Sequence, residues 1–223
     1  MRYFRPCFIG GWLYPGSVFR MKTDEKVLCL TFDDGPDPHS TPQILKILEK
    51  RNVKGIFFCN GSAAEKHKEL MDLILAGGHS VGNHSYAHPD GWKTESEKYI
   101  ADISRASAIT SATLFRPPYG HLRLKQYRIL SHNFKVFFWD LMPYYFDGKF
   151  GSEKSLRILK KLIRPGSVIV LHDNPGSSAL KFLPEFLDYA MTSGYEFVTD
   201  STFLCEKQSR LPENGVKPII DFF

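Results

Sequence analysis

The chain has 223 residues, of which 43% are hydrophobic and 24% charged, so it has enough apolar material for a folded core and is not a disordered protein. The net charge of +5 is not gathered in a basic block, which favours an ordinary solvated surface and argues against nucleic-acid binding. No stretch approaches the roughly 18 uninterrupted apolar residues of a membrane span.

This length predicts one domain over residues 1–223, with a core from about 26 to 198 and peripheral segments at 1–25 and 203–223. The apolar piece from Cys7 to Trp12 is too short and glycine-containing for a signal peptide. We therefore expect a cytoplasmic protein by default, unless a leader lies outside this sequence. Cys29 and Cys59 lie in apolar runs and are expected to be buried, and a disulfide framework is not expected.

Short apolar runs alternate with amphipathic stretches along the chain. Capping boxes are predicted at residues 62–65 and 94–97, an N-cap at Thr41, and a helix stop at Gly77. In chain order the pattern predicts a strand at 26–32, a helix from 41, a strand at 54–59, a helix from 62 to the stop, a strand at 79–82, a helix at 94–110, a strand at 114–115, a helix at 121–130, a strand at 135–139, a helix at 152–163, a strand at 167–171, a helix at 179–192 and a strand at 195–198.

About seven strand–helix units of this kind predict parallel strands joined by crossover helices. An open doubly wound sheet and a (β/α) barrel both fit that pattern. The distribution of polar side chains distinguishes the two folds. Polar residues follow four of the strands: the Asp33–Asp34 pair, His84, Arg116 and His172. A barrel brings every strand end to one rim, whereas an open sheet gathers fewer, so we expect an incomplete α/β barrel.

Asp33 and Asp34 are adjacent carboxylates at a strand end, where they could cap the loop or serve a site. His84 and His88, four residues apart, can face the same way on one helical turn, as in zinc-binding helices. With one carboxylate they make a two-histidine, one-carboxylate set that suits Zn²⁺, Fe²⁺, Co²⁺ or Mn²⁺ and leaves positions for water.

Arg116 precedes two prolines that fix its backbone, so its side chain can hold and orient a carboxylate. His172 follows a strand and could act as a general acid or base there. Taken alone, each residue also fits a purely structural role. Arg116 could be a surface arginine beside a rigid turn, and His172 could be a core or capping histidine.

Together these segments resemble the polysaccharide deacetylase family, also called the NodB-homology or carbohydrate esterase family 4 proteins. The resemblance runs from about residue 26 to 198, and four of the family's motifs occur in its order, at 31–36, 84–88, 116–120 and 170–173. It implies a deformed barrel with about seven parallel strands and removal of acetyl groups from N-acetylated sugars of a polysaccharide or oligosaccharide.

The resemblance also implies the roles of single residues. Asp33 would be the general base and His172 the general acid. One divalent ion, Zn²⁺ in first place with Co²⁺, Mn²⁺, Ni²⁺ or Fe²⁺ as alternatives, would be held by Asp34, His84 and His88. Arg116 would orient Asp33. The backbone N–H of Tyr119 would help to bind the oxyanion, and Leu171 would line the pocket for the acetyl methyl group.

The family's fourth motif departs from its pattern in this chain. Tyr145 and Phe146 stand where the family usually has Asp-Trp, and a tyrosine cannot raise the pKa of the acid histidine as a carboxylate does. Asp140, Asp147 and Asp173 are the candidates to take over that role.

Three functions therefore remain in competition at one site. They are an N-deacetylase, a hydrolase of an O-acetyl ester or a non-peptide amide, and a metal- or glycan-binding pseudoenzyme. The expected partner is an acetylated sugar, with a small non-sugar amide as the alternative substrate under the second function. No nucleic acid and no membrane span are expected, and the oligomeric state is not predicted. The aromatic residues that could stack on a sugar at the rim, or could equally belong to the core, are Trp92, Tyr144, Tyr145 and Phe146.

Overall fold

The computed structural model describes residues 9–143, 151–175 and 177–199. Within these ranges the strands are β1 (Val27–Asp33), β2 (Ile56–Cys59), β3 (Ser80–Asn83), β4 (Leu114–Phe115), β5 (Lys135–Val136), β6 (Val168–His172) and β7 (Glu196–Phe197). The helices are α1 (Ile9–Leu13), α2 (Thr41–Glu49), α3 (Gly61–Lys66), α4 (Lys68–Ala76), α5 (Ser96–Thr110), the 3₁₀ turn η1 (Pro118–Gly120), α6 (Leu124–Leu130), α7 (Gly151–Leu162) and α8 (Ala179–Thr192).

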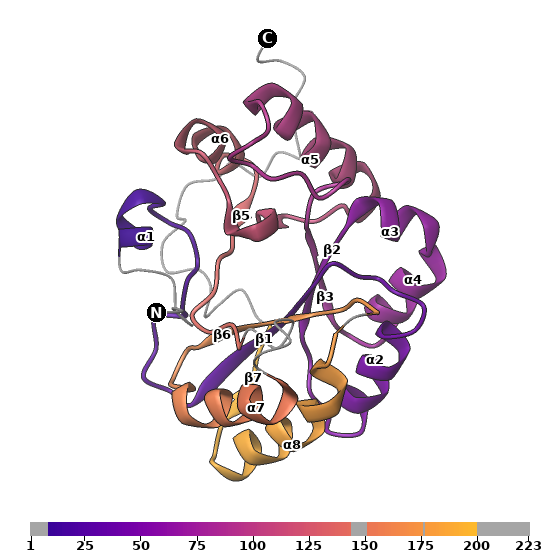
Figure 1. Cartoon of the computed structure of the whole chain (residues 1–223), viewed down its shortest axis with the longest axis vertical. Helices are drawn as coiled ribbons and strands as arrows, with labels where there is room; N and C mark the ends of the chain where they lie inside the picture. Colours follow the sequence, from indigo (N-terminus) through magenta and orange to yellow (C-terminus); the bar gives the residue numbers. More distant parts are fainter. Residues whose placement is uncertain (1–8, 144–150, 176, 200–223) are drawn as a thin grey trace.

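The strands form one parallel sheet in the order β5-β4-β3-β2-β1-β6, and β7 pairs with the start of β1. The sheet curls, and the helices lie around its outside (Figure 1). The chain after β5 runs across to β6, where Leu141 bridges Ile169, so the curl closes through an irregular segment. The expected deformed (β/α) barrel is confirmed.

β1 is buried along its whole length, and its side chains alternate between two cores. Leu28, Leu30 and Phe32 face the main core under the helices, whereas Cys29 belongs to a smaller cluster on the inner face of the curl. This alternation follows from the two-residue period of a strand. Asp33, the last residue of β1, therefore points inward with Cys29.

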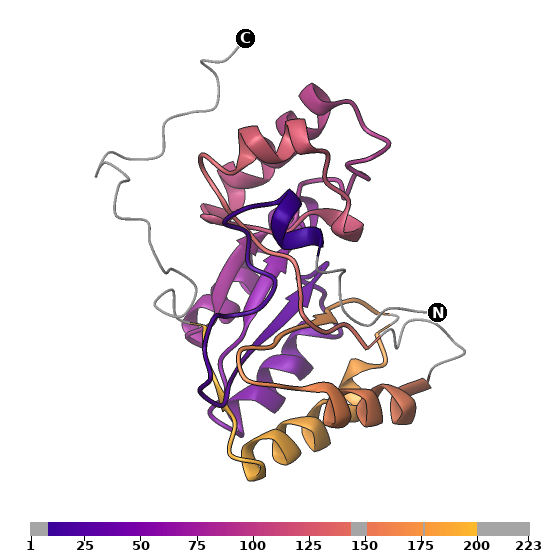
Figure 2. The same ribbon diagram turned by 90° about the vertical axis from the view of Figure 1, so that its left-hand side faces the viewer.

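A third cluster joins α5 and α6 to β4 and β5. These two helices lie at one end of the molecule, and α7 and α8 lie at the other end with the sheet between them (Figure 2). Cys29 and Cys59 are both fully buried and free, as predicted from their apolar runs. No helix among the described residues is long and apolar enough to cross a membrane.

The order of the elements agrees with the sequence prediction, but several bounds differ. β5 ends at Val136 rather than at 139, α6 begins at Leu124 rather than at 121, and the starts of α2, α3 and α5 differ as well. Ser40, not Thr41, is the N-cap of α2. Asn60 caps α3 by accepting hydrogen bonds from the Ser62 and Ala63 amides, so the predicted capping box at 62–65 does not form. Both of these caps lie nearer the preceding strand than the predicted ones.

The predicted capping box at 94–97 does not form either, since α5 begins at Ser96 after Glu95. Thr94 is used in the preceding turn, where its N–H donates to the carbonyl of Asp90. The predicted helix stop holds, because α4 ends at Ala76 with Gly77 as its C-cap. The single helix expected after residue 62 is divided at His67 into α3 and α4, and the pattern missed α1 and η1.

Candidate active site

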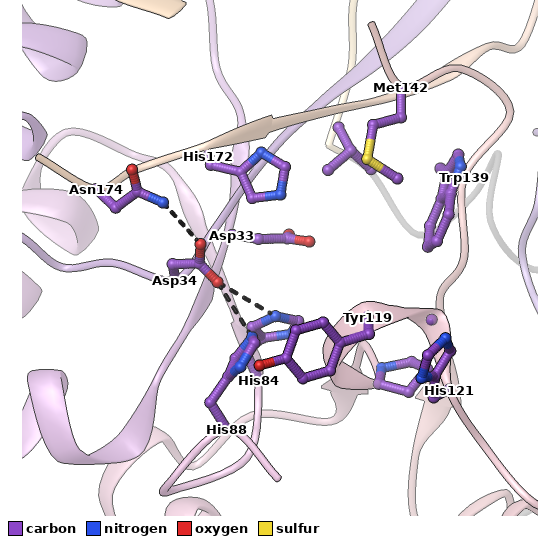
Figure 3. A pocket seen from close by; sticks show the side chains of 13 residues that line it. Asp33, Asp34, His84, His88, Tyr119, His121, Trp139, Met142, His172 and Asn174 are labelled. Carbon is purple, nitrogen blue, oxygen red and sulfur yellow. Dashed lines mark hydrogen bonds and ion pairs between the residues drawn. The ribbon is translucent and has the colours of Figure 1, made fainter. Parts of the chain in front are cut away.

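The predicted convergence of polar strand ends occurs in the structure. A cleft of about 450 Å³ opens at the carboxyl ends of the strands (Figure 3). Register places Asp33 of β1 beside His172 of β6, and His84 and Arg116 directly follow β3 and β4. The residues that line the cleft are Asp33, Asp34, His84, His88, Pro117, Tyr119, Gly120, His121, Trp139, Met142, Val170, His172 and Asn174.

Three side chains in this cleft form a metal-ligating set. Oδ1 of Asp34 lies 3.6 Å from Nε2 of His84 and 3.3 Å from Nε2 of His88, and the three ligand atoms all lie within 4.8 Å of one another (Figure 3). Ligand atoms about 2.0–2.2 Å from a tetrahedral Zn²⁺ are roughly 3.4 Å apart. The two short separations therefore match those of ligands around one shared ion.

The tautomer of His84 fits the same purpose. Its Nδ1 lies 2.8 Å from the backbone carbonyl of Arg116, and because a carbonyl can only accept, Nδ1 carries the proton. Nε2 then presents its lone pair toward Asp34. This backbone contact to the outer nitrogen is the support that metal-ligating histidines ordinarily have.

The protonation states of His84 and Asp34 also favour metal binding. Burial lowers the pKa of His84, and the nearby carboxylates offset this only in part, so the ring stays neutral. Burial by itself raises the pKa of Asp34. The side-chain hydrogen bonds with His88 and Asn174, together with the neighbouring imidazoles, outweigh it, so that pKa lies well below its ordinary value. A neutral imidazole and an ionised carboxylate are the forms that bind a metal.

The segment from His84 to His88 is a loop, so the predicted helical turn is wrong. Ser85 and His88 have positive φ angles of 65° and 58°, which no α-helix contains. The loop is held from α5, where the Asp102 carboxylate accepts the backbone N–H groups of Tyr86 at 2.7 Å and Ala87 at 3.2 Å. Because these bonds are tertiary, the spacing of the two histidines could not show how they are brought together.

Asp33 is held by a buried ion pair. Its Oδ1 lies 2.6 Å from Nη1 of Arg116, a residue with no exposed surface. The guanidinium also donates to Oγ1 of Thr31 at 2.7 Å and to the carbonyl of Phe138 at 3.0 Å, and it lies over the Phe58 ring. Arg116 therefore has one fixed position, and it fixes the carboxylate of Asp33 at the wall of the cleft.

The predicted place of Leu171 is wrong. Leu171 is fully buried in the main core under the helices, and Val170 and His172 line the cleft instead. The two-residue period of a strand puts 170 and 172 on one face and 171 on the other. Applying this two-residue period to the predicted strand would have identified Val170, and not Leu171, as the apolar residue that lines the cleft.

Asn174 is a cleft residue that sequence reasoning missed. Its Nδ2 donates to Oδ2 of Asp34 at 2.9 Å, which orients Oδ1 toward the two histidines (Figure 3). The neighbouring Asp173 points away from the cleft lining and accepts hydrogen bonds from the hydroxyls of Ser40 and Thr41. Burial raises the pKa of Asp173 to about 6, although these two bonds oppose the shift.

The rim of the cleft carries aromatic side chains. Tyr119 has a φ of 60° and is followed by Gly120 with a φ of 70°. A Cβ at Gly120 would lie 2.5 Å from the Trp139 ring, so glycine is required for Trp139 to pack there. His121 and Trp139 have no motif around them that identifies them as lining residues, and the same holds for Met142.

The fourth motif lies outside the described residues, as do Tyr144, Tyr145, Phe146 and Asp147. Of the two other candidate carboxylates, Asp140 accepts hydrogen bonds from Arg164 at 2.5 Å and from Ser167 at 2.6 Å. Ser167 precedes β6, whereas His172 ends it, so Asp140 lies at the opposite end of the strand from the histidine. Asp173 is engaged by the two hydroxyls described above.

Comparison with known proteins agrees with this architecture. The family model for polysaccharide deacetylase matches residues 20–133. A peptidoglycan-N-acetylglucosamine deacetylase of Bacillus cereus is 32% identical over 194 residues, which cover 82% of this chain and 70% of the relative. The peptidoglycan-N-acetylmuramic acid deacetylase PdaA of Bacillus subtilis is 30% identical over 209 residues, covering 85% and 76%.

A solved structure shows the same fold. The crystal structure of the Bc1960 peptidoglycan N-acetylglucosamine deacetylase in complex with a naphthalenyl N-hydroxybenzamide aligns with a TM-score of 0.82 and 30% identity, over 89% of this chain and 96% of that one. The expected enzyme class, a hydrolase of carbon–nitrogen bonds other than peptide bonds, is confirmed by these relatives. The chain belongs to the polysaccharide deacetylase family.

Proposed function

We propose that this protein is a metal-dependent deacetylase that removes the N-acetyl group from N-acetylglucosamine or N-acetylmuramic acid residues of a peptidoglycan-like glycan. One observation carries the proposal. A metal-ligating triad and an arginine-held second carboxylate lie in one cleft, with a histidine on the adjacent strand. The substrates named for the bacterial relatives support the choice of sugar.

Asp34, His84 and His88 are the residues that would hold the ion. When bound, a divalent ion such as Zn²⁺ supplies Lewis acidity to the acetyl carbonyl and lowers the pKa of a coordinated water. Asn174 and the Arg116 carbonyl keep two of the ligands in their orientation. Asp102 holds the loop that carries His88.

Asp33 is the proposed general base. Its Oδ1 is occupied by Arg116, which leaves Oδ2 to take the proton of the attacking water. The acetyl carbonyl oxygen gains negative charge as the tetrahedral species forms, and the backbone N–H of Tyr119 at the cleft is the proposed donor to it.

His172 is the proposed general acid. The amine of the sugar leaves only when its nitrogen is protonated. His172, which lines the cleft beside Asp33, is the side chain proposed to donate that proton. Val170, two residues earlier on the same face, is the apolar side chain proposed to contact the acetyl methyl group. Water adds to the carbonyl and the C–N bond breaks, so the products are acetate and a free amino sugar.

The test measures acetate release from N-acetylglucosamine oligomers by metal-stripped protein, with and without Zn²⁺ or Co²⁺. We expect activity only with added metal, and its loss in Asp33→Asn. Asp188→Asn is the matched control, because Asp188 also pairs with an arginine but lies exposed on α8. Activity that survives in Asp33→Asn would refute the assignment of the base.

The sequence at the fourth motif favours a second candidate, an O-acetyl esterase on the same site. Tyr145 stands where the family has the aspartate that tunes the acid histidine, and an ester needs less acid assistance than an amide. Acetylated xylan tested beside N-acetylglucosamine oligomers separates the two functions. Metal-dependent acetate release from xylan alone would replace the amide by the ester as substrate.

A further inference from the structure

Trp92 is a large side chain that is exposed and yet fixed. The residue keeps 56% of its surface exposed. The indole stacks on the His121 ring at 3.7 Å between centroids and 8° between planes, and Nε1 lies 3.4 Å from the carbonyl of Leu122. The backbone is held as well, because the Trp92 N–H donates to Asp90 and the Trp92 carbonyl accepts from Arg123 at 2.5 Å.

The ring beneath Trp92 is fixed by the same carboxylate. Nδ1 of His121 lies 3.0 Å from Oδ1 of Asp90, the oxygen that also accepts the Trp92 N–H. One aspartate therefore sets the position of both rings. A rigid aromatic surface loses little conformational entropy when a ligand packs on it, which is a property of binding surfaces rather than of scattered exposed apolar residues.

These two rings continue a row that begins at the metal-ligating triad. The His88 ring lies 4.6 Å from that of Tyr119, and Tyr119 lies 5.8 Å from His121. Tyr119 and His121 line the cleft side by side along one wall (Figure 3). Trp92, stacked on His121, is the last ring of this row. A glycan with one sugar at the triad can place a neighbouring sugar along these rings.

We propose that Trp92, held on His121, forms a stacking subsite for a sugar next to the one that is deacetylated, and thereby selects oligomers over single sugars. The C–H face of a pyranose ring packs on an aromatic ring, and Asp90 is the polar group beside this surface. The proposal rests on the deacetylase function proposed above, and it adds a specificity-determining residue outside the catalytic groups.

The experiment compares wild type, Trp92→Ala, Trp92→Phe and the control Trp12→Ala, whose tryptophan is 82% exposed on α1. Acetate release is measured with N-acetylglucosamine and with its tetramer, and tetramer binding is measured by calorimetry. We expect Trp92→Ala to lower kcat/KM for the tetramer about tenfold, mainly through KM, with no change for the single sugar. Trp92→Phe should keep most of the wild-type value, and Trp12→Ala all of it.

An equal loss on both substrates, or no loss on the tetramer, would overturn the subsite. The binding measurement separates this failure from that of the deacetylase. If neither substrate releases acetate, a tetramer affinity that falls about tenfold in Trp92→Ala and not in Trp12→Ala still supports the subsite. A tetramer affinity that does not change between these variants overturns it.

Discussion

Arg116 and Arg51 each pair with an aspartate, but in opposite surroundings, and this contrast gives a sharp test of the site. Arg116 has no exposed surface, and Asp33 keeps 7% of its side chain exposed. Arg51 makes two hydrogen bonds with Asp188, at 2.7 and 2.8 Å, but 59% of the Asp188 side chain is exposed. The two pairs have similar distances, so the difference between them is burial.

Arg116→Met should therefore be far more destabilising than Arg51→Met. The first change leaves a buried carboxylate without its counter-charge and removes the donors to Thr31 and Phe138. Breaking a buried pair in this way costs about 3–5 kcal/mol of unfolding free energy. The surface pair is worth about 1 kcal/mol or less, because water already solvates its charges.

The assay is urea unfolding of both variants in the presence of EDTA, so that bound metal does not contribute. The double variant Arg116→Met/Asp33→Asn should recover much of the loss, since the uncompensated charge is then gone. A difference of less than about 1 kcal/mol between the two single variants would refute the reasoning, as would a double variant no more stable than Arg116→Met.

Three further predictions follow from other contacts. Asp102→Ala should weaken Zn²⁺ binding by about 10- to 100-fold in a competition titration, because it removes the acceptor that holds the Tyr86 and Ala87 amides; unchanged affinity would contradict a positioning role. Burial lowers the pKa of His79 to about 4, while its Nδ1 accepts the Gly55 N–H. The folded state thus binds fewer protons than the unfolded state, so stability should fall by on the order of 3 kcal/mol from pH 6.5 to 4, and His79→Asn should flatten that slope in pH-dependent urea unfolding. Zn²⁺ at 100 times its dissociation constant should stabilise the folded state by about 2.7 kcal/mol, seen as a higher Tm that EDTA reverses and that His88→Ala lacks.

Most of the fold could be predicted from the sequence, because the signals are local. The apolar run at 27–30 and the polar residues after it predict β1 and the carboxylates at its end. Gly77 predicts the end of α4, and residues 179–192 form the predicted helix with the same bounds. Each of these signals acts within one or two turns of chain, so it survives in the folded molecule.

The site residues could be named for the same reason, but their geometry could not. Asp34, His84 and His88 come from two loops, and their approach depends on the Arg116 carbonyl, Asn174 and the Asp102 carboxylate. These contacts join distant parts of the chain. The four-residue spacing of His84 and His88 suggested a helical turn. The local sequence does not show the distant residues that hold this segment as a loop.

The sequence by itself thus determined the strands and most of the helices, their order, and which chemically competent side chains end the strands. Tertiary structure decided which caps begin the helices, that Val170 rather than Leu171 faces the cleft, and that Trp92 rests on His121. The physical reason is the separation along the chain of the residues that interact. Hydrophobic period and glycine stops are set by neighbours in sequence, whereas buried ion pairs, loop anchors and ring stacks need partners that only folding brings within a few ångströms.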